Sequence, residues 1–254
     1  MILRKTNKFY IILTITLIGH ILLLSSCAEI VNPQIEPENR AIKSISKWKL
    51  NLITEEKETL INYQEFDING NLIINEEYDE LGKIKLRSQF EYFMNESKEI
   101  LCFYSDTGIS KKSVFIYKYN LSGKIIEKSE LDDNGKIINI SKYNYDLNGN
   151  LISKIDESIV TGISKKTDFS YSYNNNGNLV EKYIINDGQT KSRDSIFYIP
   201  NLNQLKIYHF DEIGSVVYYS IYTYNKFGNV IYEIRYSNNN SILMKIIYDY
   251  QYFN

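Results

Sequence analysis

One short motif recurs along the chain from residue 66 onward, and it constrains the fold more than any other feature. A large apolar or aromatic residue is followed by Asp or Asn, two variable residues, Gly, then Asn or Lys and aliphatic residues, as in Tyr145–Leu151. Asp or Asn accepts hydrogen bonds from backbone groups two residues on, and Gly takes a positive φ at little cost. This combination predicts hairpin turns with a bulge. Eight clear copies place their glycines at Gly70, Gly82, Gly123, Gly135, Gly149, Gly177, Gly214 and Gly228.

The segments between these turns alternate in the way that half-buried strands do. Tyr232 and Ile234 fall on one face, for example, and Glu233 and Arg235 on the other. Glycines of neighbouring copies lie 12 or 14 residues apart, which leaves strands of about eight to ten residues. Longer gaps predict further turns at Thr161–Gly162 and Asp187–Gly188. Strands joined by such short turns must be antiparallel.

The composition favours the same fold. The 254 residues include 23 tyrosines but only two alanines, and Ala is the best helix former whereas Tyr favours strands. We therefore predict an all-β, repetitive antiparallel β-meander of about fourteen to sixteen strands, with no substantial helix in the mature chain. A single layer, a sandwich and a sheet curled into a barrel all remain open. Two alternating segments around Glu55–Glu58 predict an opening, capping hairpin.

The first residues have the pattern of an export signal. Arg4, Lys5 and Lys8 precede an apolar run, Phe9–Leu24, and Leu24, Ser25, Ser26 and Cys27 follow it. This ending resembles the lipobox of bacterial lipoproteins, and the resemblance implies cleavage before Cys27 and acylation of its thiol. The predicted organisation is a signal peptide at 1–26, a lipidated Cys and flexible tether at 27–42, and a β-hairpin repeat domain at 43–254. Export and anchoring to the bacterial membrane, at the outer membrane or cell surface, follow from this interpretation.

With Cys27 carrying the lipid, Cys102 has no partner for an internal disulfide. Its neighbours Leu101 and Phe103 predict a buried strand position, where a thiol behaves as a small apolar group.

The turn motif also carries a second resemblance. Tyr145–Leu151 resembles the YD repeats of the Rhs class, which are β-hairpin repeats of bacterial surface and secreted proteins, and the similarity covers roughly residues 63 to 252. The variant repeats of small antitoxin-like proteins are similar too. The resemblance implies a hairpin-repeat architecture and a surface-associated setting, and it implies no catalytic residue.

The chain offers little for catalysis. The mature part has one histidine, His209, with no partner apparent in the sequence, and a nucleophilic triad or a zinc site needs more. Adjacent carboxylates such as Glu76 and Glu77 point to opposite faces of a strand. The oxygens of Asp67, Asn69 and Asn71 are explained by the turn without calcium. We expect no cofactor, no metal and no enzymatic activity.

The function predicted from the sequence is therefore a non-enzymatic, lipid-anchored envelope protein that binds or scaffolds, with a glycan or a protein as ligand. The alternatives are a carboxylate-dependent glycan hydrolase and an immunity-type partner of a toxin. The formal net charge of −2 argues against nucleic acid. Tyrosines are the candidate binding groups, because aromatic rings stack on sugars and anchor protein partners. The candidate face consists of Tyr171, Tyr173, Tyr222 and Tyr224, which precede turns in pairs.

Overall fold

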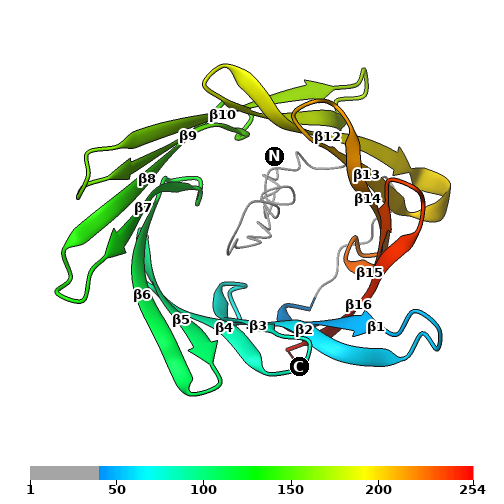
Figure 1. The fold of residues 1–254 in the computed structure, drawn as a ribbon, viewed down its shortest axis with the longest axis horizontal. Coiled ribbons are helices and arrows are strands. Elements are labelled where there is room, and N and C mark those ends of the chain that lie inside the picture. Colours follow the sequence, from blue (N-terminus) through cyan, green and yellow to red (C-terminus); the bar gives the residue numbers. More distant parts are fainter. Residues whose placement is uncertain (1–39, 254) are drawn as a thin grey trace, which may run out of the picture.

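The computed structural model describes residues 40–253, and these residues form a closed antiparallel β-barrel (Figure 1). The strands are β1 (Ile42–Leu50), β2 (Lys57–Phe66), β3 (Leu72–Tyr78), β4 (Ile84–Tyr92), β5 (Glu96–Ser105), β6 (Gly108–Tyr119), β7 (Ile125–Leu131), β8 (Ile137–Tyr145), β9 (Leu151–Ser158), β10 (Ser164–Tyr173), β11 (Leu179–Asn186), β12 (Gln189–Ile199), β13 (Gln204–Phe210), β14 (Val216–Tyr224), β15 (Val230–Ser237) and β16 (Ile242–Tyr252). A 3-10 turn, η1 (Pro200–Leu202), interrupts them between β12 and β13. No helix in this range is long and apolar enough to cross a membrane.

The predicted all-β meander is confirmed, and the structure decides among the forms that the sequence left open. Each strand pairs with its neighbour in sequence, and β1 pairs with β16 to close the ring. Lys47 lies opposite Tyr248 across this seam, and the Phe253 N–H donates to the Ala41 carbonyl at 3.0 Å. The hairpin of β1 and β2 is therefore part of the continuous wall, and the prediction that it caps one end is wrong. A cap is unnecessary because closure removes both edges of the sheet.

Local hydrogen bonds explain why the repeated motif turns the chain. In the turn between β2 and β3, the Gly70 N–H donates to the Asp67 carbonyl and the Asp67 N–H donates to the Asn71 carbonyl. The Asp67 carboxylate accepts from the N–H groups of Asn69 and Asn71 at 2.9 and 2.8 Å. Gly70 has a φ of +84°, which suits glycine and few other residues. Burial raises the pKa of Asp67, but the hydrogen bonds from Asn71 and Asn69 outweigh it and lower the pKa below its ordinary value.

All eight copies of the motif form this turn, and a ninth turn has the same pattern without the glycine. All eight glycines have φ between +74° and +84°. Between β15 and β16, Asn240 occupies the glycine position with a φ of +67°, and its N–H donates to the Ser237 carbonyl. Asn is the residue that tolerates this conformation best after Gly. The additional turns predicted at Thr161–Gly162 and Asp187–Gly188 separate β9 from β10 and β11 from β12.

The turns divide between two rims, because consecutive hairpins of a meander point in opposite directions. The N-terminal rim holds the start of β1, the end of β16 and the seven turns that leave even-numbered strands. The far rim holds the eight turns that leave odd-numbered strands. In Figure 1 the view runs down the ring of strands, from β1 at the lower right round to β16.

The two faces of the wall differ in crowding. Ser97 and Glu99 on β5 are 0% exposed, whereas Lys98, Ile100 and Cys102, which alternate with them, are half-buried. Residues opposite one another in register share a face, and the crowded face continues from strand to strand around the barrel. Curvature brings side chains together on the concave side of a barrel and spreads them on the convex side. We therefore assign the crowded face to the inner wall and the other face to the outer wall.

Tyrosines near the ends of even-numbered strands brace the inner wall. The Tyr145 hydroxyl donates to the Ile125 carbonyl at 2.7 Å, which links the end of β8 to the start of β7 across the width of the hairpin. The same bond, always spanning twenty residues, joins Tyr92 to Leu72, Tyr171 to Leu151 and Tyr250 to Val230. The hydroxyl of each tyrosine thus satisfies a backbone carbonyl beside a turn, while the tyrosine ring packs on the inner wall.

Candidate functional site

The inner wall carries buried polar groups among buried apolar side chains such as Phe90 and Leu101, and on one side of the barrel these polar groups centre on a carboxylate. Glu99 on β5 is 0% exposed. Its carboxylate accepts hydrogen bonds from the Ser88 hydroxyl at 2.6 Å and from the Tyr117 hydroxyl. The Lys128 Nζ lies 3.9 Å from Glu99 Oε2. We call these four residues, which come from β4, β5, β6 and β7, the Glu99 cluster.

Lys128 is held among aromatic rings as well as beside a carboxylate. Its Nζ lies 3.9 Å from the centre of the Phe115 ring and 5.1 Å from that of Tyr117. Burial lowers the pKa of Lys128, and the nearby Glu99 carboxylate opposes that shift. Burial also raises the pKa of Tyr117, with Glu99 adding to the effect. Glu99 and Lys128 therefore form an ion pair in which each charge is stabilised by the other, because a buried charge without a partner is costly.

Beyond Lys128 the polar line continues across β8 and β9 towards the far rim. The Asp156 carboxylate accepts from the Ser141 hydroxyl at 2.5 Å and pairs with Lys154 Nζ at 2.7 Å. Tyr143 lies beside them, and burial together with the Asp156 charge raises its pKa to about 12.

A cavity of about 230 Å³ opens at the end of this line. The residues that line it include Asn139, Asp156 and Lys165. Lys165 on β10 lies opposite Asp156 in register, so both belong to the inner wall. Asn139 donates to Glu130 at 2.7 Å, and Glu130 is also on the inner wall. We call Asn139, Asp156 and Lys165 the Asp156 site, because they join an anion, a cation and an amide at the edge of a hollow.

A second polar group occupies the opposite side of the inner wall. Glu233 on β15 accepts from the Tyr248 hydroxyl at 3.0 Å and from Arg235 Nη2 at 3.0 Å. Burial lowers the pKa of Lys47 on β1, and the charges of Glu233 and Glu77 oppose that shift. Within residues 40–253, the buried Arg235 Nε has no hydrogen-bond partner. These residues form what we call the Glu233 cluster.

His209 continues this group, and the structure supplies the partner that the sequence did not reveal. Its Nδ1 lies 2.6 Å from an oxygen of Asp194, the residue directly opposite it on β12. Its ring stacks on Tyr218 with centroids 4.2 Å apart. The sequence alone named no partner for His209, and the signal that would have found Asp194 is the register of the hairpin that β12 and β13 form around η1.

The four tyrosines proposed as a binding face all lie on the inner wall, but they do not form one patch. Tyr171 and Tyr173 are on β10, and Tyr222 and Tyr224 are four strands away on β14. Tyr222 and Tyr224 pack against the buried cluster of Ile196, Leu205 and Ile207. The Tyr171 hydroxyl is used in the brace to Leu151.

Cys27 and the preceding Leu24, Ser25 and Ser26, with the signal peptide and most of the tether, lie outside the described residues. Cys102 is half-buried on β5 and free of any disulfide.

The outer wall has a different character. Its ion pairs bridge neighbouring strands at the surface, as between Lys118 and Glu127 at 2.8 Å and between Arg87 and Glu76 at 3.4 Å. Aromatic rings form a ladder on it over β12 to β15, in which Tyr219 stacks on Tyr236 with centroids 4.8 Å apart. Charged pairs and aromatic rings therefore both occur on this surface.

Within residues 40–253, no three His, Cys, Asp or Glu side chains are grouped so as to hold a metal ion. Glu76 and Glu77, which are adjacent in sequence, lie on the outer and inner walls respectively. Several carboxylates on the inner wall are hydrogen-bonded to hydroxyl, amide or charged side chains, and these bonds fix their positions.

Comparisons with known proteins give distant similarities only. No family model matches the chain, and no curated protein sequence matches it. A porin-like protein from Bacteroides vulgatus is 10% identical, with a TM-score of 0.42 over 84% of this chain and 99% of its own. A porin-like protein from Bacteroides uniformis is 11% identical, with a TM-score of 0.37 over 83% of this chain and 98% of its own.

A third solved structure, of the complex TcdB2-TccC3-Cdc42, is 11% identical with a TM-score of 0.24. The match covers 78% of this chain and 15% of that one. All three similarities are too distant to assign a function.

Proposed function

We propose that the protein is a non-enzymatic, lipid-anchored protein of the bacterial envelope that binds a glycan chain along its inner wall. The observation that carries the proposal is the placement of tyrosine rings beside fixed carboxylates and ammonium groups on the concave face, as at Tyr143, Asp156 and Lys154. Sugars present hydroxyl groups at their edges and C–H groups on their faces. Charged groups bind the former and aromatic faces pack on the latter.

The barrel is wide enough for such a ligand. Sixteen strands spaced by about 4.8 Å and tilted in the usual way give a backbone diameter of about 30–35 Å. Side chains of a wall this wide do not meet at the axis, and barrels of 16 strands leave an aqueous passage. The Asp156 site faces that space and offers a donor and an acceptor close to one another, which is the arrangement that fixes a sugar hydroxyl.

The residues of the outer wall favour a location of the barrel in water rather than in lipid. Lys118, Glu127, Arg87 and Glu76 lie on it as cross-strand ion pairs. A charged residue on a lipid-facing strand position costs about 2–4 kcal/mol at the bilayer midplane. We therefore place the barrel beside the membrane, with acylated Cys27 as its attachment, and the twelve residues from 28 to 39 as the link.

Two adjacent lysines on β10 provide a matched test. Lys165 lines the Asp156 site on the inner wall, whereas Lys166 lies on the outer wall and pairs with Asp168 at 2.9 Å. Binding of purified bacterial and plant oligosaccharides to the full mature protein would be measured by calorimetry. Lys165→Ala should weaken binding about tenfold or more, because it removes a charged hydrogen-bond donor. Lys166→Ala should leave the affinity unchanged.

Equal affinities for the two variants would refute the inner-wall site. Assaying the same mixtures for shortened oligosaccharides tests the hydrolase alternative, and we expect none. A single tight protein ligand in place of any glycan would favour the immunity-type alternative and overturn the proposal.

A further inference from the structure

The two rims of the barrel differ sharply in charge. The eight turns of the far rim contain ten acidic and two basic residues, a net charge of −8. The seven turns of the N-terminal rim contain two acidic and two basic residues, a net charge of zero. The turns of the far rim include Glu55, Glu56, Asp79, Glu80, Asp106, Asp132, Asp133, Asp187, Asp211 and Glu212.

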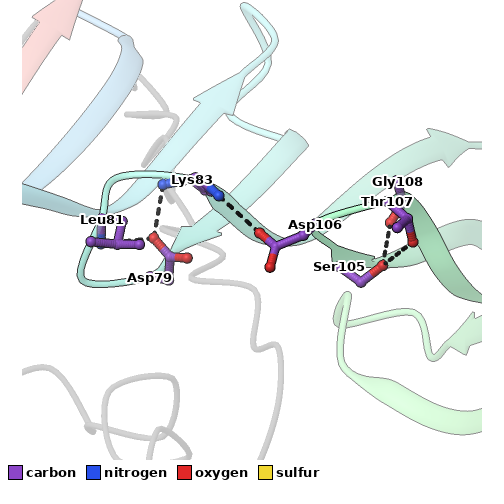
Figure 2. Close-up of polar contacts among 7 residues, drawn as sticks. All are labelled: Asp79, Leu81, Lys83, Ser105, Asp106, Thr107 and Gly108. Atoms are coloured by element: carbon purple, nitrogen blue, oxygen red, sulfur yellow. Dashed lines mark hydrogen bonds and ion pairs between the residues drawn. The ribbon is translucent and has the colours of Figure 1, made fainter.

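Figure 2 shows two neighbouring turns of the acidic rim. The Asp79 carboxylate accepts from the N–H groups of Leu81 and Lys83, and the Lys83 side chain reaches Asp106 of the next turn at 2.8 Å. Lys83 and Lys136 are the two basic residues in the turns of this rim. Lysines on the strands offset part of this excess, since Lys191 pairs with Glu212 at 3.3 Å and Lys245 pairs with Glu55, but the turns of the far rim themselves keep a net charge of −8.

The N-terminal rim, whose turns carry no net charge, also presents exposed apolar side chains. Leu121 and Leu147 are 105% and 106% exposed, and Met94 is 96% exposed. Ile68, Phe93 and Leu202 add to the ring of exposed apolar tips on this rim. Apolar tips also occur on the far rim, as at Ile53, Leu81, Val160 and Ile213, but the turns there carry a net charge of −8. Only one rim therefore combines exposed apolar groups with an absence of net negative charge.

The chain leaves the barrel at this same rim. Arg40 lies just before β1, with its guanidinium carbon 4.5 Å from the centre of the Tyr252 ring on β16. Twelve residues separate Cys27 from Arg40, which gives a reach of at most about 40 Å. An anchored Cys27 thus keeps the N-terminal rim within a short distance of the bilayer.

We propose that the N-terminal rim docks on the phospholipid surface, with its apolar turn tips in the headgroup region and the acidic rim facing away. This proposal rests on the lipid anchor of the proposed function. Bacterial membranes carry anionic headgroups, which repel turns with a net charge of −8 and attract Arg40, Lys124 and Lys226 on the opposite rim. Transfer of exposed Leu, Ile, Met and Phe side chains from water into the membrane interface lowers the free energy. The barrel axis then stands upright, with one mouth open to the surroundings.

The test compares two leucines that occupy equivalent turns on opposite rims. In a Cys102→Ser background, Leu147→Cys or Leu81→Cys in the full lipidated protein would carry an environment-sensitive fluorophore. The protein would be reconstituted in vesicles of phosphatidylethanolamine and phosphatidylglycerol, some with spin-labelled acyl chains. Emission from position 147 should shift to the blue and be quenched several-fold more than emission from position 81. Equal quenching, or stronger quenching at position 81, would overturn the proposal.

The mass of the mature N-terminus separates this failure from that of the anchor. A lipidated Cys27 with no quenching at position 147 refutes the docking of the rim alone. An unmodified Cys27 refutes the anchor and with it the docking, while glycan binding at the Asp156 site is measured independently of both.

Discussion

The ion pair of the Glu99 cluster gives the sharpest test of how the inner wall is stabilised. Removing one member of a buried pair typically costs 3–5 kcal/mol, because the other charge stays buried without a partner. Lys128 retains the Phe115 ring at 3.9 Å and is 23% exposed at its side chain. Glu99→Gln should therefore fall at the lower end of that range, at about 3 kcal/mol.

The double-mutant cycle isolates the pair from the rest of the wall. Lys128→Met alone leaves Glu99 with only the Ser88 and Tyr117 hydroxyls, and should cost about 3–4 kcal/mol. Glu99→Gln combined with Lys128→Met removes both charges, and the double variant should be more stable than either single one. The free energies would come from urea unfolding followed by circular dichroism. A loss in the double variant equal to the sum of the single losses would refute the argument.

An outer-wall pair provides the control. Lys118 Nζ and a Glu127 oxygen are closer, at 2.8 Å, but their side chains are 48% and 23% exposed. Water screens such pairs, so the coupling free energy in the equivalent cycle should be below about 1 kcal/mol. A shorter distance with a smaller coupling would show that burial, and not proximity, sets the strength of these pairs.

Three further predictions concern tyrosines and glycines. Burial raises the pKa of Tyr143 and Tyr145 to about 12. The unfolded chain therefore loses these protons at a lower pH than the folded protein does, and the free energy of unfolding should fall between about pH 10 and pH 12. Unfolding followed by tyrosinate absorbance at several pH values measures this fall, and a free energy of unfolding that does not change with pH would contradict the prediction. Tyr145→Phe removes the brace and should cost about 1 kcal/mol in urea unfolding, with no loss counting against the brace. Gly149→Ala should destabilise more than Gly135→Ala, because an added Cβ at Gly149 displaces Lys124 Nζ, which donates to the Gly149 carbonyl, whereas nothing lies within 4 Å of an added Cβ at Gly135. Equal losses would contradict this.

The sequence was a good guide to local structure because each turn is a short-range hydrogen-bonded unit. The motif located eight of the turns between β2 and β16. The turn at Asp187–Gly188 needed no long-range information either. The residues within each turn determine where the chain reverses direction, so the positions of the turns could be predicted without knowledge of the tertiary structure.

Closure and the direction of each face could not be read in the same way. Lys47 and Tyr248 pair across the whole length of the chain, and no local pattern specifies such a contact. The alternation of residues along β15 correctly placed Tyr232 and Ile234 on the opposite face from Glu233, but the face that carries Glu233 is the buried one. Glu233 is 4% exposed on the inner wall, where Tyr248 and Arg235 satisfy it. An apolar-inside rule fails here because a wide barrel leaves polar space within it.

The inner wall, the two rims and the ligand site all depend on closure of the barrel, and a cross-link between β1 and β16 tests closure directly. Ser46 and Asp249 lie opposite one another across the seam, within the range of Cα distances that a disulfide bridges. In a Cys102→Ser background, Ser46→Cys with Asp249→Cys should form an intramolecular disulfide under mild oxidation. Ser46→Cys with Lys142→Cys on distant β8 should not. Free thiols or only intermolecular bonds in the first variant would show that the sheet is open and would contradict the structure described above.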